Sequence, residues 1–575
     1  MNINLNFVWT TVFVKRLENL GLKYVCISPG SRSTPLTLAF AESKKIKSFV
    51  FADERQSAYF ALGLAKKTST PVAIVTTSGT ATAEVYPAII EAYQTCVPLI
   101  VCTADRPYYL RNTGANQTIN QENLYRNHIN FFADLRLPKL TDARLSKLIK
   151  ITDKAFSISN KLGPVHLNFP FEKPLEPWVF NIEFDEGKID YYANKDKQTE
   201  SEKKHTVPKR IFKEIKKASK VLILLGGNLS EKVNDKILRF SKKHNIPIIA
   251  DGTNAARFSK NSSTVISYGS AILKSGIEKF EPQLIISFGK APTTNPILEF
   301  YKKSSAVKIL VNSKNRINDP TRTYNFFVNL YEIFFVKEIE KLKVKIDKSY
   351  LEAFVEAENE IENFVKQNFI TNDLKFEGNV VKSIIKNIPE KSILFLGNST
   401  IPRDFDYFSG KFPKSIKIYS NRGASGIDGI ISTAAGISKA LGKRIYLYIG
   451  DLSFYYDVNF LHYLKELKIP LTIVLQNNNG GGIFELLPVA DKRKHFQKYF
   501  KMPLKIDFEK IVLSYGIKYY LIQDEKELEK LFKKFETENK TPIVFEIKTE
   551  AEYSKSLRNK FFNEVNILLN KKFDS

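Results

Sequence analysis

Short apolar runs alternate with longer amphipathic segments along almost the whole chain, and a polar turn follows most of the runs. A run of about four to eight apolar residues is typical of a buried strand, whereas apolar positions three or four residues apart are typical of a helix. Strands that alternate with helices favour a parallel sheet covered on both faces. The sequence therefore predicts an α/β protein. The runs interpreted as strands span residues 24–28, 48–52, 72–77, 99–103, 221–227, 246–251, 284–289, 306–312, 392–396, 416–419, 444–449 and 470–476.

These runs fall into three blocks, which predict three doubly wound parallel-sheet domains. A chain of 575 residues is too long for a single hydrophobic core. We expect an N-terminal domain at residues 1–182, a central domain at 208–345 and a C-terminal domain at 375–575. Residues 183–208 are polar and lack apolar periodicity, which predicts a linker. Residues 338–386 are expected to be largely helical.

The composition narrows the class of protein. The net charge of +26 would suit a nucleic-acid partner, but the lysines are spread along the chain without a long block of like charges, so we expect none. The three cysteines form no CxxC pair, which favours a reducing compartment. No apolar run approaches the ~20 residues of a membrane span, and no signal-peptide pattern is seen. The sequence predicts a cytoplasmic protein without a membrane partner.

Arginines stand in several of the turns that follow predicted strands, although most basic residues of the chain are lysines. Arg32, Arg106 and Arg422 are three of them. The C-terminal ends of parallel strands meet at one edge of a sheet, where open α/β folds bind their ligands. An arginine fork binds a carboxylate or phosphate through two hydrogen bonds, which lysine cannot do. These positions therefore indicate small anionic ligands.

A candidate cation site follows two of the later strands. Asp451 comes after the run 444–449, and Asn477–Gly480 comes after the run 470–476. A carboxylate, an amide oxygen and a backbone carbonyl suit Mg²⁺, which prefers oxygen ligands and also holds phosphate oxygens. Glycines let the backbone approach those phosphates. This pattern resembles the diphosphate motif of thiamine diphosphate enzymes, and the alternative is an ordinary Asn/Gly turn after a buried strand.

A series of further motifs makes the resemblance more specific. The motifs are Ile27–Leu36 (ISPGSRSTPL), Asp53–Arg55 (DER), Thr77–Ala81 (TSGTA), Thr103–Pro107 (TADRP), Gly114–Gln117 (GANQ), Gly397–Ser399 (GNS), Ser420–Gly429 (SNRGASGIDG), Gly450–Ser453 (GDLS) and Asn477–Phe484 (NNNGGGIF). From about residue 5 to residue 550, the chain resembles the 2-succinyl-5-enolpyruvyl-6-hydroxy-3-cyclohexene-1-carboxylate synthases, a family of thiamine diphosphate-dependent enzymes. The SPGSRS and SNRGASGIDG strings are far more specific to this family than the metal motif is.

The resemblance implies pyrimidine-binding, central and diphosphate-binding domains, in that order. It implies a homodimer or homotetramer whose active sites are shared between subunits. The implied cofactors are thiamine diphosphate and Mg²⁺, or Mn²⁺. The implied reaction decarboxylates 2-oxoglutarate and adds the succinyl carbanion equivalent to isochorismate, a step of menaquinone biosynthesis. The alternative is another thiamine diphosphate-dependent enzyme such as acetolactate synthase, which would lack the SPGSRS string and would normally carry a flavin site in its central domain.

Positions that match the family's motifs assign the candidate site. Glu54 matches the acid that engages the cofactor's pyrimidine ring, so we expect burial to shift its pKa. The candidate catalytic residues are Glu54 and Gln117. The candidate substrate-binding residues are Ser31, Arg32, Arg106, Gln117, Ser399, Arg403 and Arg422. The candidate cofactor-binding residues are Glu54, Ser399, Arg422, Gly423, Ile427, Asp451, Leu452, Ser453, Asn478, Gly480, Ile483 and Phe484, of which Asp451, Asn478 and Gly480 are also the candidate metal ligands.

Three positions need comment. Arg403 lies in a predicted helix beside Asp404 and Asp406, and the alternative to substrate binding is an ordinary surface arginine. Leu452 stands where the wider superfamily has glycine, although it resembles this family. Asn295 lies about where many relatives place a lysine that contacts substrate, so we expect that contact to come from elsewhere, for example from Lys290.

Overall fold

The computed structural model describes residues 2–180, 182–185, 187–194, 206–259, 263–314, 316–369, 373–411, 414–538 and 541–573. Its contacts divide the chain into two compact units. The first unit comprises Met1–Glu202, Gly423–Lys443 and Tyr456–Phe460, and the second comprises Lys203–Arg422, Arg444–Tyr455 and Leu461–Ser575. Three parallel sheets, one in the first unit and two in the second, confirm the predicted α/β fold class. The residue bounds of the three expected domains remain a prediction.

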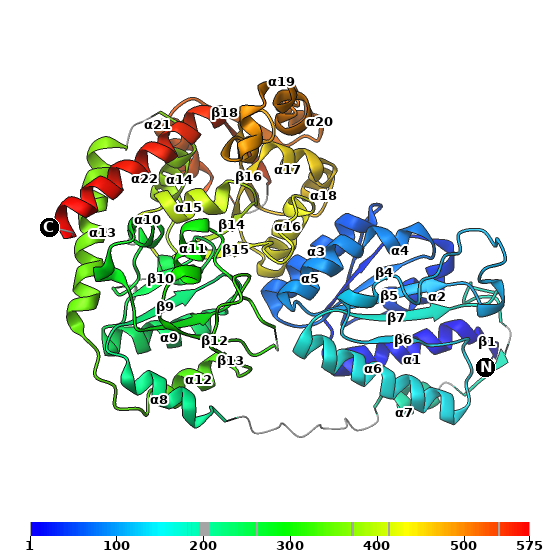
Figure 1. Cartoon of the computed structure of the whole chain (residues 1–575). Helices are drawn as coiled ribbons and strands as arrows, with labels where there is room; N and C mark the ends of the chain where they lie inside the picture. The colour runs from blue at the N-terminus through cyan, green and yellow to red at the C-terminus, as the bar shows by residue number, and fades with distance from the viewer. Residues whose placement is uncertain are drawn as a thin grey trace. The chain divides into compact units, whose positions relative to one another are not determined.

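The first unit is built on a six-stranded sheet in which all neighbouring strands are parallel (Figure 1). Its strands, in spatial order, are β3 (Lys47–Val50), β2 (Tyr24–Ile27), β4 (Val72–Thr76), β5 (Leu99–Asp105), β7 (Val165–Pro170) and β6 (Phe132–Asp134). Every residue of β4, β5 and β7 is buried, as expected for central strands with both faces covered. The four strands predicted in this block correspond to β2, β3, β4 and β5, whereas β6 and β7 were not predicted.

Helices cover both faces of this sheet. On one face, α1 (Leu5–Leu20), α2 (Thr34–Ala41), α6 (Asp142–Leu162) and α7 (Gly187–Ala193) share a hydrophobic core with the strands. On the other face, α3 (Glu54–Thr68) packs on β2 and β4 and against α5 (Tyr86–Thr95) (Figure 1). Helix α1 begins after Asn4, whose side chain accepts hydrogen bonds from two backbone N–H groups of the first turn, and it ends at Gly21 in the left-handed conformation.

The prediction of a linker at residues 183–208 is wrong for its first part, because residues 187–193 form helix α7. Ile189 and Tyr192 are buried against the core of the first unit. The Nη1 atom of Arg16 donates a hydrogen bond to the carbonyl of Ala193 at 2.9 Å, which anchors the end of α7 to α1. The buried residues of this short helix, Ile189, Tyr192 and Ala193, are therefore enough to dock it although it also carries Lys188 and Asp190. Residues 195–205 lie outside the described part of the chain.

Helix α16 (Ile430–Leu441) packs closely on α3 within the first unit. Glycines permit the approach: a Cβ atom on Gly63 would lie 2.1 Å from the carbonyl oxygen of Thr433, and one on Gly436 would lie 2.3 Å from that of Phe60. The first turn of α16 is bound by a buried carboxylate, because Ser432 donates its backbone N–H to Asp457 at 2.8 Å. The backbones of α3 and α16 are therefore in direct contact where Gly63 and Gly436 meet.

The second unit contains a five-stranded and a six-stranded sheet, and all neighbouring strands in both are parallel. The first sheet, in spatial order, consists of β10 (Ile248–Ala250), β9 (Val221–Leu225), β11 (Leu284–Phe288), β12 (Val307–Val311) and β13 (Phe326–Val328). The second consists of β15 (Lys417–Ser420), β14 (Ile393–Leu396), β16 (Ile445–Gly450), β17 (Leu471–Asn477), β19 (Ile543–Lys548) and β18 (Lys518–Ile522). The eight strands predicted here are present, and β13, β18 and β19 were not predicted.

Helices also cover the sheets of the second unit. One face of the five-stranded sheet shares a core with α8 (Lys209–Lys217), α9 (Glu231–His244) and α12 (Glu332–Ile339). Its other face shares a core with α10 (Gly269–Ser275), α11 (Asn295–Lys303), α13 (Lys348–Asn368) and the C-terminal helix α22 (Ala551–Phe573). Helices α14 (Glu377–Asn387), α15 (Ile401–Phe408) and α21 (Glu525–Phe535) contribute to the core of the six-stranded sheet. The largely helical stretch predicted at 338–386 corresponds to α13 and most of α14. In the part of the chain that the structure describes, none of the helices is long and apolar enough to cross a bilayer.

Candidate functional site

Two arginines of the first unit follow strands at the C-terminal edge of its sheet. Arg32 lies in the short turn Ser31–Ser33 after β2, and its Nη1 atom donates to the carbonyl of Phe171 at 2.8 Å. Arg106 directly follows β5, and its Nη1 atom donates to the hydroxyl of Ser78 just beyond β4. Both acceptors are neutral, so these contacts orient the guanidinium groups without neutralising their charge.

The environment of these arginines suits an anion. Burial, followed by the nearby charge of Arg106, lowers the pKa of Arg32, and burial also lowers the pKa of Arg106. The nearby Asp105 forms its ion pair with Arg111 instead, at 2.9 Å. Within the described ranges, neither Arg32 nor Arg106 has an ion-pair partner of its own. Two partly desolvated cations at one sheet edge are suited to binding a carboxylate or a phosphate.

Gln117 is brought to the same edge. Its Nε2 atom donates to the carbonyl of Ser78 at 2.9 Å, and its backbone has a φ of 57°. A Cβ atom on Gly79 would lie 2.8 Å from the Cγ of Gln117, so the glycine leaves room for this side chain. Ser31 is exposed beside Arg32. Ser78, which the sequence reasoning did not single out, therefore contacts both Arg106 and Gln117.

Glu54 is the first residue of α3. The side chain of Asp53 caps this helix by accepting the backbone N–H of Gln56 at 3.2 Å. Burial is the main cause that raises the pKa of Glu54, and the neighbouring Asp53 and Glu84 carboxylates raise it further, whereas its own backbone N–H lowers it. The carboxyl therefore keeps its proton to a higher pH than an exposed glutamate, as its expected role requires.

Gly423 and Ile427 also belong to the first unit, in the loop that precedes α16. The backbone N–H groups of Gly423 and Ala424 donate to the two carboxylate oxygens of Glu91 at 2.9 and 2.8 Å. Lys66 forms an ion pair with the same carboxylate at 3.4 Å. Ile427 is half-buried. Glu91 thus fixes the start of this loop.

In the second unit, Asp451 and Gly480 meet at the ends of the adjacent strands β16 and β17. One oxygen of Asp451 accepts the N–H of Gly480 at 2.7 Å, and the other accepts the N–H of Leu452 at 2.7 Å. Burial raises the pKa of Asp451 to about 6, although these two hydrogen bonds lower it. Gly480 has a φ of 119°, and a Cβ atom there would lie 2.0 Å from the carbonyl oxygen of Lys501. This position therefore requires glycine.

Asn478 presents a buried oxygen next to this pair. Its Nδ2 atom donates to Glu377 at 2.8 Å, but its Oδ1 atom is buried and receives no hydrogen bond from the described residues. A buried acceptor without a partner is costly, which indicates that a ligand completes it. Among the described residues, the carbonyl of Gly480 accepts a hydrogen bond from the N–H of Gly482 at 2.9 Å, and a carbonyl oxygen has a second lone pair for a ligand.

These donors fit a hard cation. Nowhere in the described ranges do three His, Cys, Asp or Glu side chains gather as a metal site. The candidate site instead offers one carboxylate, one amide oxygen and one backbone carbonyl, from Asp451, Asn478 and Gly480. Mg²⁺ characteristically binds with few carboxylates and takes its remaining oxygens from water and phosphate.

Ser399 and Arg422 lie beyond the adjacent strands β14 and β15 of the second unit. The Nη1 atom of Arg422 donates to the side chain of Asn398 at 2.9 Å, which joins the two loops. Ser399 has a φ of 70°, in the left-handed region. The side chain of Arg403 turns back one helical turn and donates to the carbonyl of Ser399. The three candidate substrate residues of this unit are therefore neighbours.

The two carboxylates beside Arg403 are bound by other arginines. Asp404 is held by Arg558 at 2.6 Å, and Asp406 is held by Arg257 at 3.3 Å. Arg403 instead lines a cavity of about 850 Å³. The cavity is also lined by Asn295, Lys274, Lys303, Tyr407 and Leu486. The structure therefore places Asn295 and Arg403 on one cavity, together with two lysines of the central block.

The remaining candidates of the second unit surround the glycine-rich loop. Ile483 and Phe484 lie in the short helix Gly482–Leu486, where both are half-buried. The ring of Phe484 packs edge-on against that of Phe500, with centroids 5.7 Å apart. In helix α17 (Asp451–Tyr456), Leu452 is half-buried and Ser453 is buried.

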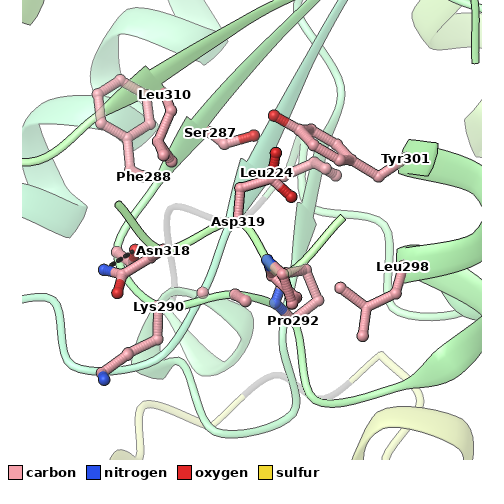
Figure 2. Close-up of a pocket in the computed structure, with 14 residues that line it drawn as sticks. Leu224, Ser287, Phe288, Lys290, Pro292, Leu298, Tyr301, Leu310, Asn318 and Asp319 are labelled. Carbon is pink, nitrogen blue, oxygen red and sulfur yellow. Dashed lines mark hydrogen bonds between the residues drawn. The ribbon is translucent and has the colours of Figure 1, made fainter. Parts of the chain in front are cut away.

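Lys290 lies at a different cavity, at the C-terminal edge of the five-stranded sheet. Figure 2 shows Ser287 and Asp319 facing each other there, whereas the side chain of Lys290 extends away from them. The side chain of Asn318 donates to the carbonyl of Gly289 at 2.9 Å and closes one side. The cavity holds only about 20 Å³, roughly the space of one water molecule.

Comparison with known proteins matches both the first and the last block of the chain. Residues 9–124 match the family described as "Thiamine pyrophosphate enzyme, N-terminal TPP binding domain", and residues 411–547 match "Thiamine pyrophosphate enzyme, C-terminal TPP binding domain". These matches show a thiamine diphosphate-binding protein.

Three similar proteins carry the same name, 2-succinyl-5-enolpyruvyl-6-hydroxy-3-cyclohexene-1-carboxylate synthase. The protein from Bacillus cytotoxicus is 36% identical over 88% of this chain and 87% of its own length. The protein from Oceanobacillus iheyensis is 34% identical over 94% of both chains, and that from Listeria innocua is 33% identical over 95% of both chains. Similarity of this extent, together with the two matched domains, shows that the chain belongs to the 2-succinyl-5-enolpyruvyl-6-hydroxy-3-cyclohexene-1-carboxylate synthase family of thiamine diphosphate-dependent transferases.

Proposed function

We propose that the chain catalyses the decarboxylation of 2-oxoglutarate and the transfer of the remaining succinyl unit to isochorismate, with thiamine diphosphate and Mg²⁺, or Mn²⁺, as cofactors. The product is 2-succinyl-5-enolpyruvyl-6-hydroxy-3-cyclohexene-1-carboxylate, an intermediate of menaquinone biosynthesis. The observation that carries this proposal is similarity to synthases of this name over 87% or more of their length. When bound, thiamine diphosphate supplies the carbanion chemistry that decarboxylation of a 2-oxo acid requires.

Residues of the first unit provide the acid and a carboxylate-binding pair. Glu54 would donate a hydrogen bond from its protonated carboxyl to a pyrimidine nitrogen of the cofactor, and its raised pKa supports that role. Arg32 and Arg106 bind substrate carboxylates, supported by their lack of an ion-pair partner among the described residues. Ser31 and Gln117, which lie on the same edge, orient the bound substrate.

Residues of the second unit hold the cation, the diphosphate and the rest of the substrate. Asp451, Asn478 and the Gly480 carbonyl bind Mg²⁺, supported by the unpartnered amide oxygen of Asn478. The further proposed cofactor contacts of this unit are Ser399, Arg422, Leu452, Ser453, Ile483 and Phe484, and Gly423 and Ile427 of the first unit are also proposed cofactor contacts. Ser399, Arg403 and Arg422 also bind substrate, and Lys274 and Lys303 are the cations of the central block that line the same cavity as Arg403.

We further propose that residues 1–182 bind the pyrimidine and residues 375–575 the diphosphate, on either side of a central domain at 208–345. Each active site is proposed to be shared between the subunits of a homodimer or homotetramer. The free cysteines support a location in the cytoplasm. Acetolactate synthase is the less favoured alternative, because proteins similar to almost the whole chain carry the name 2-succinyl-5-enolpyruvyl-6-hydroxy-3-cyclohexene-1-carboxylate synthase.

The proposal is tested with the purified chain, thiamine diphosphate and Mg²⁺. We expect turnover of 2-oxoglutarate that depends on isochorismate. Mass spectrometry then identifies the product. Pyruvate in place of 2-oxoglutarate should give little product. Efficient condensation of two pyruvate molecules, or no use of isochorismate, would contradict the proposed reaction.

A further inference from the structure

The candidate metal ligand Asn478 is oriented by a carboxylate from a distant part of the chain. Glu377 is the first residue of α14 and is fully buried. Its Oε1 atom accepts the Nδ2 hydrogen bond of Asn478 at 2.8 Å. The two residues are 101 positions apart in the sequence. Their contact therefore depends on the tertiary fold and not on the glycine-rich motif itself.

The other oxygen of Glu377 is bound by the C-terminal helix. Arg558 of α22 donates its Nη2 atom to Oε2 of Glu377. The same guanidinium group donates through Nε and Nη2 to the two oxygens of Asp404, each at 2.6 Å. All three charged groups are buried. Because Arg558 occupies the far side of Glu377, the near oxygen of this carboxylate remains directed at Asn478.

This arrangement determines which end of the Asn478 amide faces the cation. An asparagine side chain has an NH₂ group that only donates and an oxygen that only accepts. A carboxylate that is bound on its other side by arginine can only accept, so it pairs with the NH₂ end. The oxygen is then left on the opposite side of the amide, where it is buried without a partner in the described part of the chain.

We propose that Glu377 is a positioning residue for the cation site, held by Arg558 so that the oxygen of Asn478 faces the metal. The inference rests on the proposed function, in which Asn478 binds Mg²⁺. Residues that hydrogen-bond to metal ligands typically change metal affinity about 10- to 100-fold when they are replaced. Glu377 would act in this way through Asn478, without being a proposed ligand of the cation itself.

The test measures Mn²⁺ affinity directly, by electron paramagnetic resonance of free Mn²⁺ in protein saturated with thiamine diphosphate. In the Glu377→Gln variant, the side chain has a single acceptor oxygen, and Arg558 competes for it. When that oxygen faces Arg558, the new NH₂ group faces Asn478 and can only donate to it. The Asn478 amide then turns its oxygen towards residue 377 and its nitrogen towards the cation. We expect Mn²⁺ to bind about 10- to 100-fold more weakly.

Glu546→Gln is a matched control. Glu546 is a buried carboxylate of β19 that accepts the Nδ2 hydrogen bond of Asn477, the residue before Asn478, at 2.8 Å. The chemical change and the type of contact are therefore the same, but Asn477 is not a proposed ligand. Mn²⁺ affinity should stay unchanged in this variant. An equal loss in both variants would overturn the inference in favour of general loosening of the sheet.

A second pair of variants tests whether Glu377 acts by orienting the Asn478 amide or by stabilising the fold. In an Asn478→Asp variant, the side chain presents an oxygen on either side and needs no orientation. Adding Glu377→Gln to that background removes the repulsion between two carboxylates, so Mn²⁺ binding should become stronger. The opposite sign in the two backgrounds supports a positioning role. A loss of the same size in both backgrounds contradicts it.

Two outcomes distinguish this inference from the proposed function. Failure of the wild-type protein to bind Mn²⁺ with thiamine diphosphate would refute the metal site itself. Normal binding by the wild type and by a folded Glu377→Gln variant would refute only the role of Glu377. Should that variant not fold, Glu377→Asp keeps the charge beside Arg558 but shortens the reach to Asn478. Unchanged affinity in folded Glu377→Asp would also overturn the inference.

Discussion

Arg32 and Arg106 are held by uncharged acceptors at a sheet edge, so their charges are available to a ligand. A desolvated charge-assisted pair is typically worth about 1.5–3 kcal/mol, which corresponds to a loss of about 10- to 100-fold in affinity. We therefore expect Arg32→Ala and Arg106→Ala to raise KM by that factor for at least one substrate. The lysine variants should recover only part of the loss, because lysine lacks the planar fork.

Initial rates with 2-oxoglutarate and isochorismate varied separately measure these effects. Arg403 should show a smaller effect than Arg32 or Arg106, because Lys274 and Lys303 line the same cavity and can hold part of the substrate's charge when Arg403 is removed. An arginine whose alanine and lysine variants both leave the two KM values unchanged has no part in substrate binding.

The Glu54→Gln variant tests whether the proton of the candidate catalytic acid is needed for turnover. The amide has almost the same shape as the carboxyl group but cannot relay a proton. We expect kcat to fall by at least about 100-fold. Thiamine diphosphate should still bind, as measured by calorimetric titration. Glu84→Gln is a suitable control, since Glu84 acts on Glu54 only through its charge. A near wild-type kcat in Glu54→Gln would show that this carboxyl is a bystander.

Among single residues, those that stand in short sequence motifs could be predicted as part of the site. Asp451, Asn478 and Gly480 stand in short motifs at predicted strand ends, so their meeting follows from a parallel sheet. Glu377 and Arg558 could not be predicted in this way, because 181 residues separate them and neither belongs to a recognisable motif. An arginine in an amphipathic helix is usually solvated, and only the fold shows that Arg558 is buried.

Among the elements, the contact between α3 and α16 allows a test of packing. In Gly63→Ala, the new Cβ atom would meet the carbonyl oxygen of Thr433 at 2.1 Å, so the two helices must separate. Overpacking of this kind costs about 1–3 kcal/mol, against about 1 kcal/mol gained in helix propensity. We expect a net loss of stability in thermal unfolding.

Gly450→Ala serves as the control for this substitution, because a Cβ atom there meets nothing within 4 Å. It should leave the unfolding temperature nearly unchanged. A Gly63→Ala variant as stable as the wild type would show that the helices can move apart without cost.

Most of the predicted strands contain few polar residues, whereas two of the strands that were missed contain buried polar residues within a short apolar run. Strand β7 was missed because His166 and Asn168 interrupt its pattern, yet both are buried and both contact Thr103 by hydrogen bonds, at 2.7 and 2.8 Å. Strand β19 was missed for a similar reason, because the buried Glu546 interrupts its apolar run. Strands β6 and β18 lie at sheet edges, where partly exposed residues weaken the apolar signal.

For the whole molecule, ligand binding should be visible as stability. A ligand that binds only the folded state adds about 2.7 kcal/mol when present at 100 times its Kd. We expect thiamine diphosphate with Mg²⁺ to raise the unfolding temperature of the wild type, and a chelator to reverse the rise. Asp451→Ala should abolish the rise, measured against the same variant without ligands, because the variant also leaves the backbone N–H groups of Leu452 and Gly480 without their acceptor and so has a lower unfolding temperature of its own. A full ligand-induced rise in this variant would contradict the metal assignment.

The position of Arg558 on the last helix has a consequence for how the protein is made. Arg558 lies 154 residues after Asp404 and 181 residues after Glu377. During translation, both acidic residues are therefore synthesised long before the arginine that pairs with them. Buried carboxylates that lack a cation disfavour each other's charge. The region around α14 and α15 is therefore expected to close only after α22 has left the ribosome. A nascent chain stalled ahead of Arg558 should remain open to protease in this region.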